Sequence, residues 1–113
     1  MDTERRERQR CNAKGLIALT SKGVGQVVNL STKGMYLRFA NIVTFPDKSV
    51  IDLYGNTGFS ILEMHTKKVW SRILVDLDGY SYKPFKSEIF INFETLSFSQ
   101  ECQLVNYLRQ QKD

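Results

Sequence analysis

The sequence predicts a small antiparallel β-barrel that carries one α-helix at its C-terminal end. Short runs of β-branched and aromatic residues recur along the chain and are separated by polar or glycine-containing turns. After about residue 96 the apolar period changes from that of a strand to that of a helix. The length of 113 residues suits a single domain. The chain is therefore expected to be mainly β, with a helix packed on the barrel.

The strands are expected in a regular order along the chain. They are predicted at residues 16–19, 26–30, 34–39, 50–53 and 88–93, with 59–63 and 67–77 as one long strand or two short ones. Turns or loops are predicted at 21–25, 44–48, 54–58 and 78–84. In 34–39, period-2 alternation puts Met35, Leu37 and Phe39 on one face. Tyr36 and Arg38 then lie on the opposite face of that strand.

The terminal helix is predicted from an apolar stripe and from capping residues. The stripe consists of Leu96, Cys102, Leu104, Val105 and Leu108. Ser97 or Ser99 is expected to cap the N-terminus of the helix. The domain organisation that follows is an arginine-rich arm over residues 1–12 and a barrel domain over 13–113. The arm is too polar to order itself by burying apolar surface, so we expect it to be flexible on its own.

Charge and composition favour an anionic partner and give no sign of catalysis. The formal net charge is +4 and the isoelectric point is about 9.2. Cys11 and Cys102 are too few for a disulfide framework or a zinc site, and we expect reduced thiols in a cytoplasmic protein. His65 is the only histidine and is expected to be a surface or strand residue. We therefore expect no enzyme, no metal and no cofactor, and no apolar run is long enough for membrane insertion.

The hexamer from Asn29 to Gly34 connects two of the predicted strands. Asn29 and Ser31 are two residues apart, so in an extended backbone they point to the same face. Gly34 would allow a positive φ or the close approach of a ligand to the backbone. Asn and Ser also cap backbone groups in ordinary hairpin turns, which is the simplest interpretation of this segment taken alone. Asn29-Leu30-Ser31 matches a glycosylation pattern too, but the charged start of the chain does not resemble a signal peptide.

A second motif precedes the hexamer. Arg6 and Arg10 form an Arg-x-x-x-Arg element, followed by a predicted strand and then by Asn29-x-Ser31-x-x-Gly34. This combination, in this order, resembles the PilZ domain family. The resemblance implies a six-stranded antiparallel barrel with a flanking helix, and it covers nearly the whole chain. Its specific motifs lie within residues 6–34.

The resemblance implies a receptor for cyclic di-GMP, a bacterial second messenger with two guanines and two phosphates. Arg6 and Arg10 would then grip guanine edges and phosphate, since a guanidinium bonds guanine O6 and N7 in a bidentate way. Asn29 and Ser31 would bond the other guanine, and Gly34 would shape the turn. Many members of the family have Asp where this chain has Asn29. An amide accepts guanine N–H groups with its oxygen alone, so we expect binding to survive but to be weaker.

Two further residues extend the expected site. Arg5 precedes the Arg-x-x-x-Arg element and is expected to reach a phosphate, and Trp70 is expected to stack on a guanine. The competing interpretation of Trp70 is a half-buried residue of the barrel surface or core. The competing interpretation of the arm is a disordered basic tail with nonspecific affinity for anions.

Two other functions stay open at this level. One is a protein-interaction module of the same fold that does not bind nucleotide. The other is a small barrel for single-stranded nucleic acid, which the basic charge, Tyr36, Tyr54 and Trp70 would permit, although we do not expect sequence-specific binding. For the receptor, ligand binding is expected to order the arm and to present it to a separate, unidentified effector protein. We expect a monomer or a weak dimer.

Overall fold

The computed structural model describes residues 11–12, 15–56, 58–74 and 84–111. The strands are β1 (Cys11–Asn12), β2 (Ile17–Thr20), β3 (Gly23–Leu30), β4 (Gly34–Phe39), β5 (Lys48–Tyr54), β6 (Ser60–Ile73) and β7 (Ser87–Phe93), followed by the helix α2 (Phe98–Gln110). Two predicted segments lie outside the described residues. They are the part of the arm before Cys11 and the end of the predicted strand 67–77 beyond Leu74.

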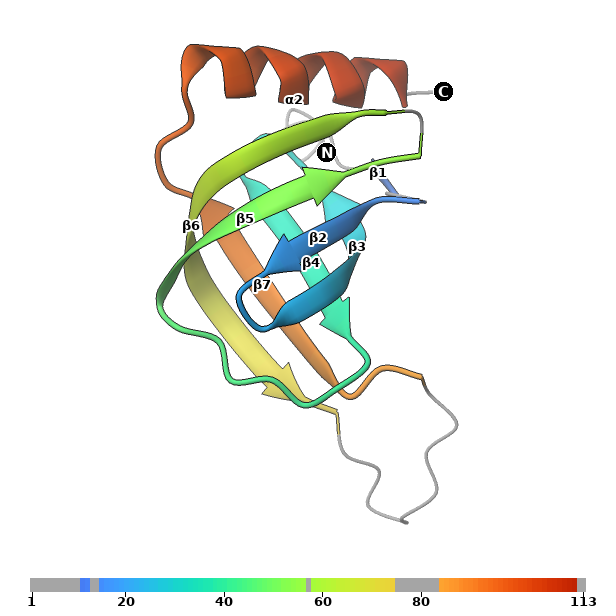
Figure 1. Ribbon diagram of the computed structural model, residues 1–113, viewed down its shortest axis with the longest axis vertical. Helices are drawn as coiled ribbons and strands as arrows, with labels where there is room; N and C mark the ends of the chain where they lie inside the picture. Colours follow the sequence, from blue (N-terminus) through green and yellow to red (C-terminus); the bar gives the residue numbers. More distant parts are fainter. Residues whose placement is uncertain (1–10, 13–14, 57, 75–83, 112–113) are drawn as a thin grey trace, which may run out of the picture.

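All strand pairings are antiparallel, and they close the sheet on itself (Figure 1). The order β3-β2-β5-β6-β7-β4 is joined into a ring because β3 also pairs with β4. The short strand β1 pairs with the end of β3, with Asn12 opposite Asn29 and Cys11 opposite Leu30. The prediction of a six-stranded antiparallel barrel with a C-terminal helix is confirmed.

The interior of the barrel is filled by apolar side chains that alternate with outward-facing ones along each strand. Met35, Leu37 and Phe39 are buried as predicted, whereas Tyr36 and Arg38 are half-buried on the outside. The buried apolar residues are Leu16, Ala18, Val27, Leu30, Met35, Leu37, Phe39, Phe45, Ile51, Leu53, Ile61, Met64, Ile89, Ile91, Leu104 and Leu108. A closed barrel leaves only its two ends to be covered.

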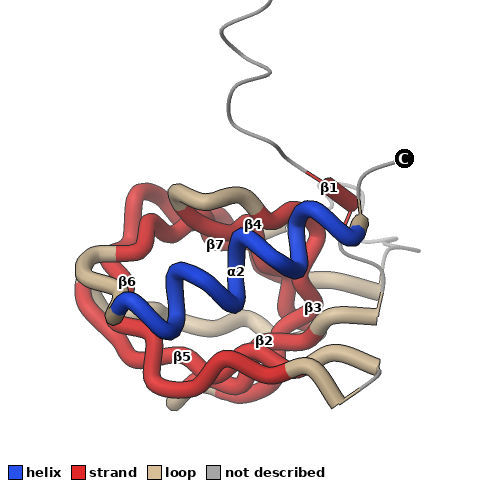
Figure 2. The backbone as a smooth tube through the Cα atoms, turned by 90° about the horizontal axis from the view of Figure 1, so that it is seen from above, coloured by secondary structure: helices blue, strands red, loops and turns tan. Residues whose placement is uncertain are grey.

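Helix α2 covers one of these ends, as Figure 2 shows from above. Leu104 and Leu108 join the barrel core, and the ring of Tyr107 stacks on Phe59 with centroids 4.4 Å apart. Of the two candidate caps, Ser97 is the one used. Its hydroxyl accepts a hydrogen bond from Gln100 N, and the Gln100 side chain accepts one from Ser97 N, which forms a capping box.

The predicted turn at 21–25 was too long. Residues Gly23 to Gly25 belong to β3, and only Ser21 and Lys22 form the turn. Gly25 is paired with Ala18 and lies beneath Phe39, since a Cβ atom on it would come within 2.9 Å of that ring. This glycine therefore serves core packing, and its turn-like composition was misleading.

The two predicted strands at 59–63 and 67–77 form the single long strand β6 over its described part. Its register against β5 shifts between Ile51 and Leu53. Glu63 takes a positive φ of 56° there, and its N–H donates to the Asp52 carboxylate at 2.7 Å. A hydrogen-bonded bulge therefore bends β6 without ending it.

Candidate functional site

A cavity of about 580 Å³ lies on the outer face of the barrel where β3, β4, β6 and β7 meet. It brings together residues from three separate parts of the sequence, within 29–36, at 70 and within 90–92. Its lining consists of Asn29, Leu30, Ser31, Lys33, Gly34, Tyr36, Trp70, Phe90 and Asn92. The cavity therefore contains four of the residues predicted from sequence, namely Asn29, Ser31, Gly34 and Trp70.

Two β-bulges direct the key side chains into this cavity. Val27 pairs with Leu37 and Asn29 with Tyr36, so Val28 is an extra residue in β3. The shift places Val27 in the core and Asn29 on the outer face, although alternation alone would put both on one face. A second register shift between Lys68 and Trp70 likewise brings Trp70 opposite the outward-facing Phe90.

Three cross-strand rows organise the outer face of β4, β7 and β6. The first row contains Gly34, Asn92 and Lys67. The second row is aromatic and contains Tyr36, Phe90 and Trp70. The third row is charged and contains Arg38, Glu88 and Arg72. The aromatic row forms a wall of the cavity, which we call the aromatic wall. The charged row lies next to it, on the side away from Gly34 and Asn92.

The Ser31 hydroxyl holds the turn at one side of the cavity. It accepts hydrogen bonds from Lys33 N at 3.1 Å and from Gly34 N at 3.3 Å. The simple interpretation of Ser31 as a turn cap therefore describes its contacts in the unliganded chain. The Asn29 amide differs, because it makes no hydrogen bond with any residue that the structure describes. Among the described residues, Asn29 therefore contributes to the lining of the cavity without a side-chain partner.

Gly34 is required by the packing of β4 against β7. A Cβ atom at this position would lie 2.0 Å from the carbonyl oxygen of Ile91 and 2.9 Å from Cα of Asn92. Its φ is not positive, so the first predicted reason for glycine is wrong. The second, the close approach of a ligand, stays a prediction, and the group that lies close in the structure is the backbone of β7.

The aromatic wall is formed by Trp70 and the two rings with which it makes tilted contacts. Trp70 lies with its ring centroid 5.9 Å from Tyr36 and 6.1 Å from Phe90. These are ordinary distances for tilted aromatic pairs. The guanidinium carbon of Arg72 lies 5.4 Å from the Trp70 ring centroid. Trp70 nevertheless keeps 40% of its surface exposed, so part of the indole is open to a planar ligand.

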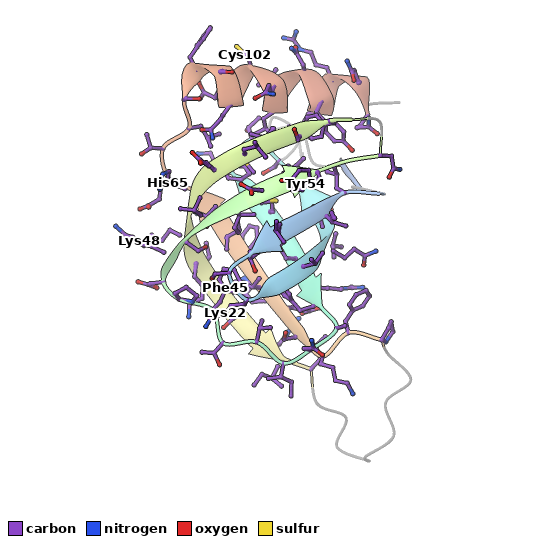
Figure 3. All side chains as sticks on the ribbon, viewed as in Figure 1. Lys22, Phe45, Lys48, Tyr54, His65 and Cys102 are labelled. Carbon is purple, nitrogen blue, oxygen red and sulfur yellow. The ribbon has the colours of Figure 1, made fainter. Side chains whose placement is uncertain are left out.

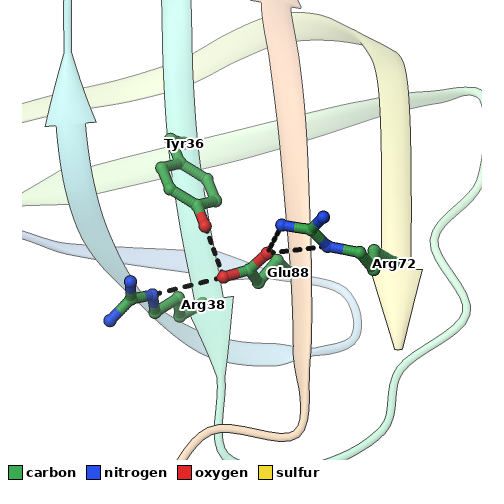
Figure 4. A network of polar contacts seen from close by, with 4 residues as sticks. All are labelled: Tyr36, Arg38, Arg72 and Glu88. Carbon is green, nitrogen blue, oxygen red and sulfur yellow. Dashed lines mark hydrogen bonds and ion pairs between the residues drawn. The ribbon is translucent and has the colours of Figure 1, made fainter. Parts of the chain in front are cut away.

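Glu88 is the centre of a polar network beside the aromatic wall, shown in Figure 4. Its Oε1 accepts hydrogen bonds from Arg72 Nη2 at 2.7 Å and from Arg72 Nε at 3.2 Å. Its Oε2 accepts a hydrogen bond from the hydroxyl of Tyr36. Arg38 Nε lies 3.5 Å from the same oxygen and contributes an ion pair without hydrogen-bond geometry.

The network shifts the pKa values of its members. Burial alone would raise the pKa of Glu88, but hydrogen bonds from Tyr36 and Arg72 and the positive charges of Arg72 and Arg38 outweigh it, so the pKa is lowered. Burial and the hydrogen bond to Glu88 raise the pKa of Tyr36. Glu88 is therefore an anion and Tyr36 a neutral donor at neutral pH.

Several residues of this region were not predicted as site residues. Phe90 and Asn92 line the cavity, and Glu88 organises its wall. The sequence indicates a role for Tyr36 only in the alternative of nucleic-acid binding. The outward positions of 90 and 92 in the last strand were the available signal, but nothing local indicated that this strand lies between β4 and β6. Arg5, Arg6 and Arg10 lie outside the described residues.

Other predicted features are simple to locate in Figure 3. His65 is an exposed residue of β6, as predicted, and Cys102 is an exposed free thiol on α2. Within the described ranges, no group of three or more His, Cys, Asp or Glu residues is arranged to hold a metal ion. No helix in the part of the chain that the structure describes is long and apolar enough to cross a membrane.

Comparison with known proteins identifies the fold. No protein-family model matches the chain, and no curated protein matches it significantly. Among solved structures, the PilZ domain of YcgR from Escherichia coli, determined with c-di-GMP, superposes with a TM-score of 0.66. The match covers 95% of this chain and 91% of that one, at 15% sequence identity. The protein therefore has a PilZ-like fold.

Proposed function

We propose that this protein is a non-catalytic receptor for cyclic di-GMP. The observation that carries the proposal is the cavity on which Asn29, Ser31, Gly34 and Trp70 converge. The likeness in fold to a PilZ domain whose structure contains c-di-GMP supports the same ligand class. We further propose that the receptor acts in the cytoplasm, where reduced cysteines such as Cys102 are the norm.

The cavity offers complementary chemistry for a purine nucleotide. The Asn29 amide, which lines the cavity, would accept N–H groups of a guanine edge through its oxygen. The exposed part of Trp70 would stack on a base, an interaction that contributes about 1–3 kcal/mol per base. Lys33, an exposed residue that lines the cavity, would place a positive charge near a phosphate.

We propose that Arg6 and Arg10 complete the site, with Arg5 as a further phosphate contact. The pairing of β1 with Asn29 and Leu30 supports this, because the arginines precede β1 directly in the chain. An Arg guanidinium can read guanine O6 and N7 and can also clamp a phosphate. A lysine would supply the charge without the planar fork.

Binding would transmit a signal by ordering the arm. Fixing a residue costs roughly 1–2 kcal/mol, so an arm that is loose without ligand would be fixed only by strong ligand contacts. The ordered arm would then present a new surface to a separate effector protein. Hydrogen exchange over residues 3–12 should slow at saturating ligand. Unchanged exchange there would contradict the switch while leaving ligand binding intact.

Calorimetric titration of cyclic di-GMP into the wild type and Arg10→Ala tests the receptor function. Loss of one charged contact should weaken binding by roughly 2–4 kcal/mol, or about 30- to 1000-fold. Arg109→Ala is the matched control, because it removes the same charge from an exposed position on α2. GTP and cyclic di-AMP test selectivity.

Each outcome of this titration has a distinct meaning. Selective binding that is lost in Arg10→Ala and kept in Arg109→Ala supports the receptor. No binding by the folded wild type overturns the receptor and favours a PilZ-fold interaction module without nucleotide. Binding to single-stranded nucleic acid with a steep salt dependence, and without preference for cyclic di-GMP, would instead favour a nucleic-acid barrel.

A further inference from the structure

We infer that Glu88 is a positioning residue that holds the indole ring of Trp70 in the wall of the cavity, acting through Arg72 and Tyr36. The inference rests on the proposed function, in which Trp70 stacks on a base of the ligand. Glu88 itself does not line the cavity. Its effect on ligand binding would be exerted entirely through the side chains that it orders.

The first connection runs from Glu88 to Arg72 and then to Trp70. Both Nε and Nη2 of Arg72 donate to Glu88 Oε1, which fixes the plane of the guanidinium. The guanidinium carbon then lies 5.4 Å from the Trp70 ring centroid, within cation–π range. The Arg72 side chain is 60% exposed, so a long, flexible side chain would sample other rotamers without this anchor.

The second connection runs through Tyr36. Its hydroxyl donates to Glu88 Oε2, and its ring lies 5.9 Å from Trp70. Tyr36 and Arg72 come from β4 and β6, on the two sides of the strand that carries Glu88. One carboxylate in the middle strand therefore ties two neighbours of Trp70 together, as Figure 4 shows for the polar groups.

The burial of Glu88 indicates that its charge has a specific task. The residue is only 5% exposed, and a buried carboxylate is costly unless its oxygens are fully bonded. Both oxygens are bonded here, and Arg38 adds a second positive charge at 3.5 Å. An uncharged residue in this place would leave Arg38 and Arg72 without the anion that draws them inward.

A fixed Trp70 favours binding because less side-chain freedom is lost when a base stacks on it. Trp70 also contacts Phe90 on the middle strand, with the two rings tilted and their centroids 6.1 Å apart. We therefore expect removal of the Glu88 charge to loosen the indole while the barrel stays folded.

The experiment uses Trp70 as a reporter, since it is the only tryptophan in the chain. In ligand-free Glu88→Gln, the emission of Trp70 should shift to longer wavelength, its quenching by acrylamide should increase, and its fast anisotropy decay should gain amplitude. Glu94→Gln is the matched control, because it removes an equal charge from a partly exposed ion pair with Lys48. Unchanged quenching and anisotropy in Glu88→Gln would overturn the inference.

Titration with cyclic di-GMP provides the second readout. The affinity of Glu88→Gln should be about 3- to 10-fold lower than that of the wild type, a part of the stacking contribution of one base. Glu94→Gln should bind as the wild type does. If the wild type does not bind cyclic di-GMP, the proposed function fails. The quenching comparison still decides whether Glu88 positions Trp70.

Arg72→Gln keeps the test decisive if Glu88→Gln does not fold, because the Arg72 side chain is largely exposed. It should loosen Trp70 in the same way. Where both single variants fold, Trp70 in the double variant of Glu88→Gln with Arg72→Gln should be quenched no more than in the more affected single variant, since both residues act in one connection. Additive losses in the double variant would contradict the connection through Arg72.

Discussion

Tyr36 and Glu88 are 52 positions apart in the chain, yet the hydroxyl of one donates a hydrogen bond to the carboxylate of the other. The bond joins the aromatic wall of the cavity to the charged row beside it. Their strands are neighbours in the barrel, with Tyr36 opposite Phe90 and Arg38 opposite Glu88. The contact therefore depends on the register of β4 against β7 and would be lost after a shift of one residue.

The stability contributed by Glu88 should depend on pH. Its pKa in the folded protein lies below the ordinary value of 4.5, so on acidification the unfolded chain takes up this proton first. The contribution is complete above the ordinary pKa and is lost as the pH falls through the lower, folded-state pKa. At pH 7, Glu88→Gln should reduce the free energy of unfolding by about 2 kcal/mol.

Urea unfolding of the wild type and Glu88→Gln at several pH values between 7 and 3 checks this dependence. The difference in the free energy of unfolding between the two proteins should become smaller toward pH 3, because the Glu88 carboxyl of the wild type becomes neutral as well. Glu94→Gln corrects for general acid effects at an exposed carboxylate. A difference that stays constant down to pH 3 would contradict the assignment of Glu88 as a buried anion.

Gly34→Ala should destabilise the barrel by about 3 kcal/mol, since the new methyl group would meet the backbone of β7. Gly55→Ala is the matched comparison, because a Cβ atom there would meet only the side chains of Leu16 and Phe59 at 3.0 Å or more. Thermal and denaturant unfolding should rank the two losses in that order. If Gly34→Ala reduces the stability as little as Gly55→Ala does, β7 can move away from β4 at little cost.

Asn29→Asp should strengthen the binding of cyclic di-GMP, if the receptor function holds. A carboxylate can accept two N–H groups of a guanine edge, which should add about 1 kcal/mol, or roughly fivefold in affinity. Calorimetry compares this variant with Asn106→Asp, which makes the same change at an exposed position on α2. Weaker binding by Asn29→Asp alone would indicate that this side chain faces a phosphate and not a guanine.

Ser97→Ala should destabilise the protein by about 1 kcal/mol, because the first turn of α2 loses its capping hydroxyl. Ser99→Ala is the control, since Ser99 lies inside the first turn and is exposed. Its effect should be close to zero. The urea concentrations at the unfolding midpoints of the two variants measure the difference in stability. Equal destabilisation by the two substitutions would contradict the capping box.

Local chemistry was sufficient to predict much of this molecule. Alternation correctly assigned the two faces of β4, and the change of period located α2. The two sequence motifs also pointed to the fold, although the arginine motif lies outside the described residues. These features are predictable because they depend on neighbours two to four positions away along the chain.

The details of the candidate site were harder to predict from the sequence. Gly25 was assigned to a turn, because its contact with Phe39 joins two different strands. The bulge at Val28 was not anticipated either, and it is what separates the faces of Val27 and Asn29. A bulge depends on the partner strand as much as on its own sequence, so local periodicity does not reveal it.

The sequence by itself determined a mainly β barrel with a capped terminal helix, and it identified Asn29, Ser31, Gly34 and Trp70 as the residues to examine. Only the tertiary structure decided that these residues share one cavity and that Gly34 accommodates a neighbouring strand. It also decided that Glu88 connects Tyr36 with Arg72. The physical reason is that strand order and register bring together residues far apart in the chain, and no local pattern encodes those pairings.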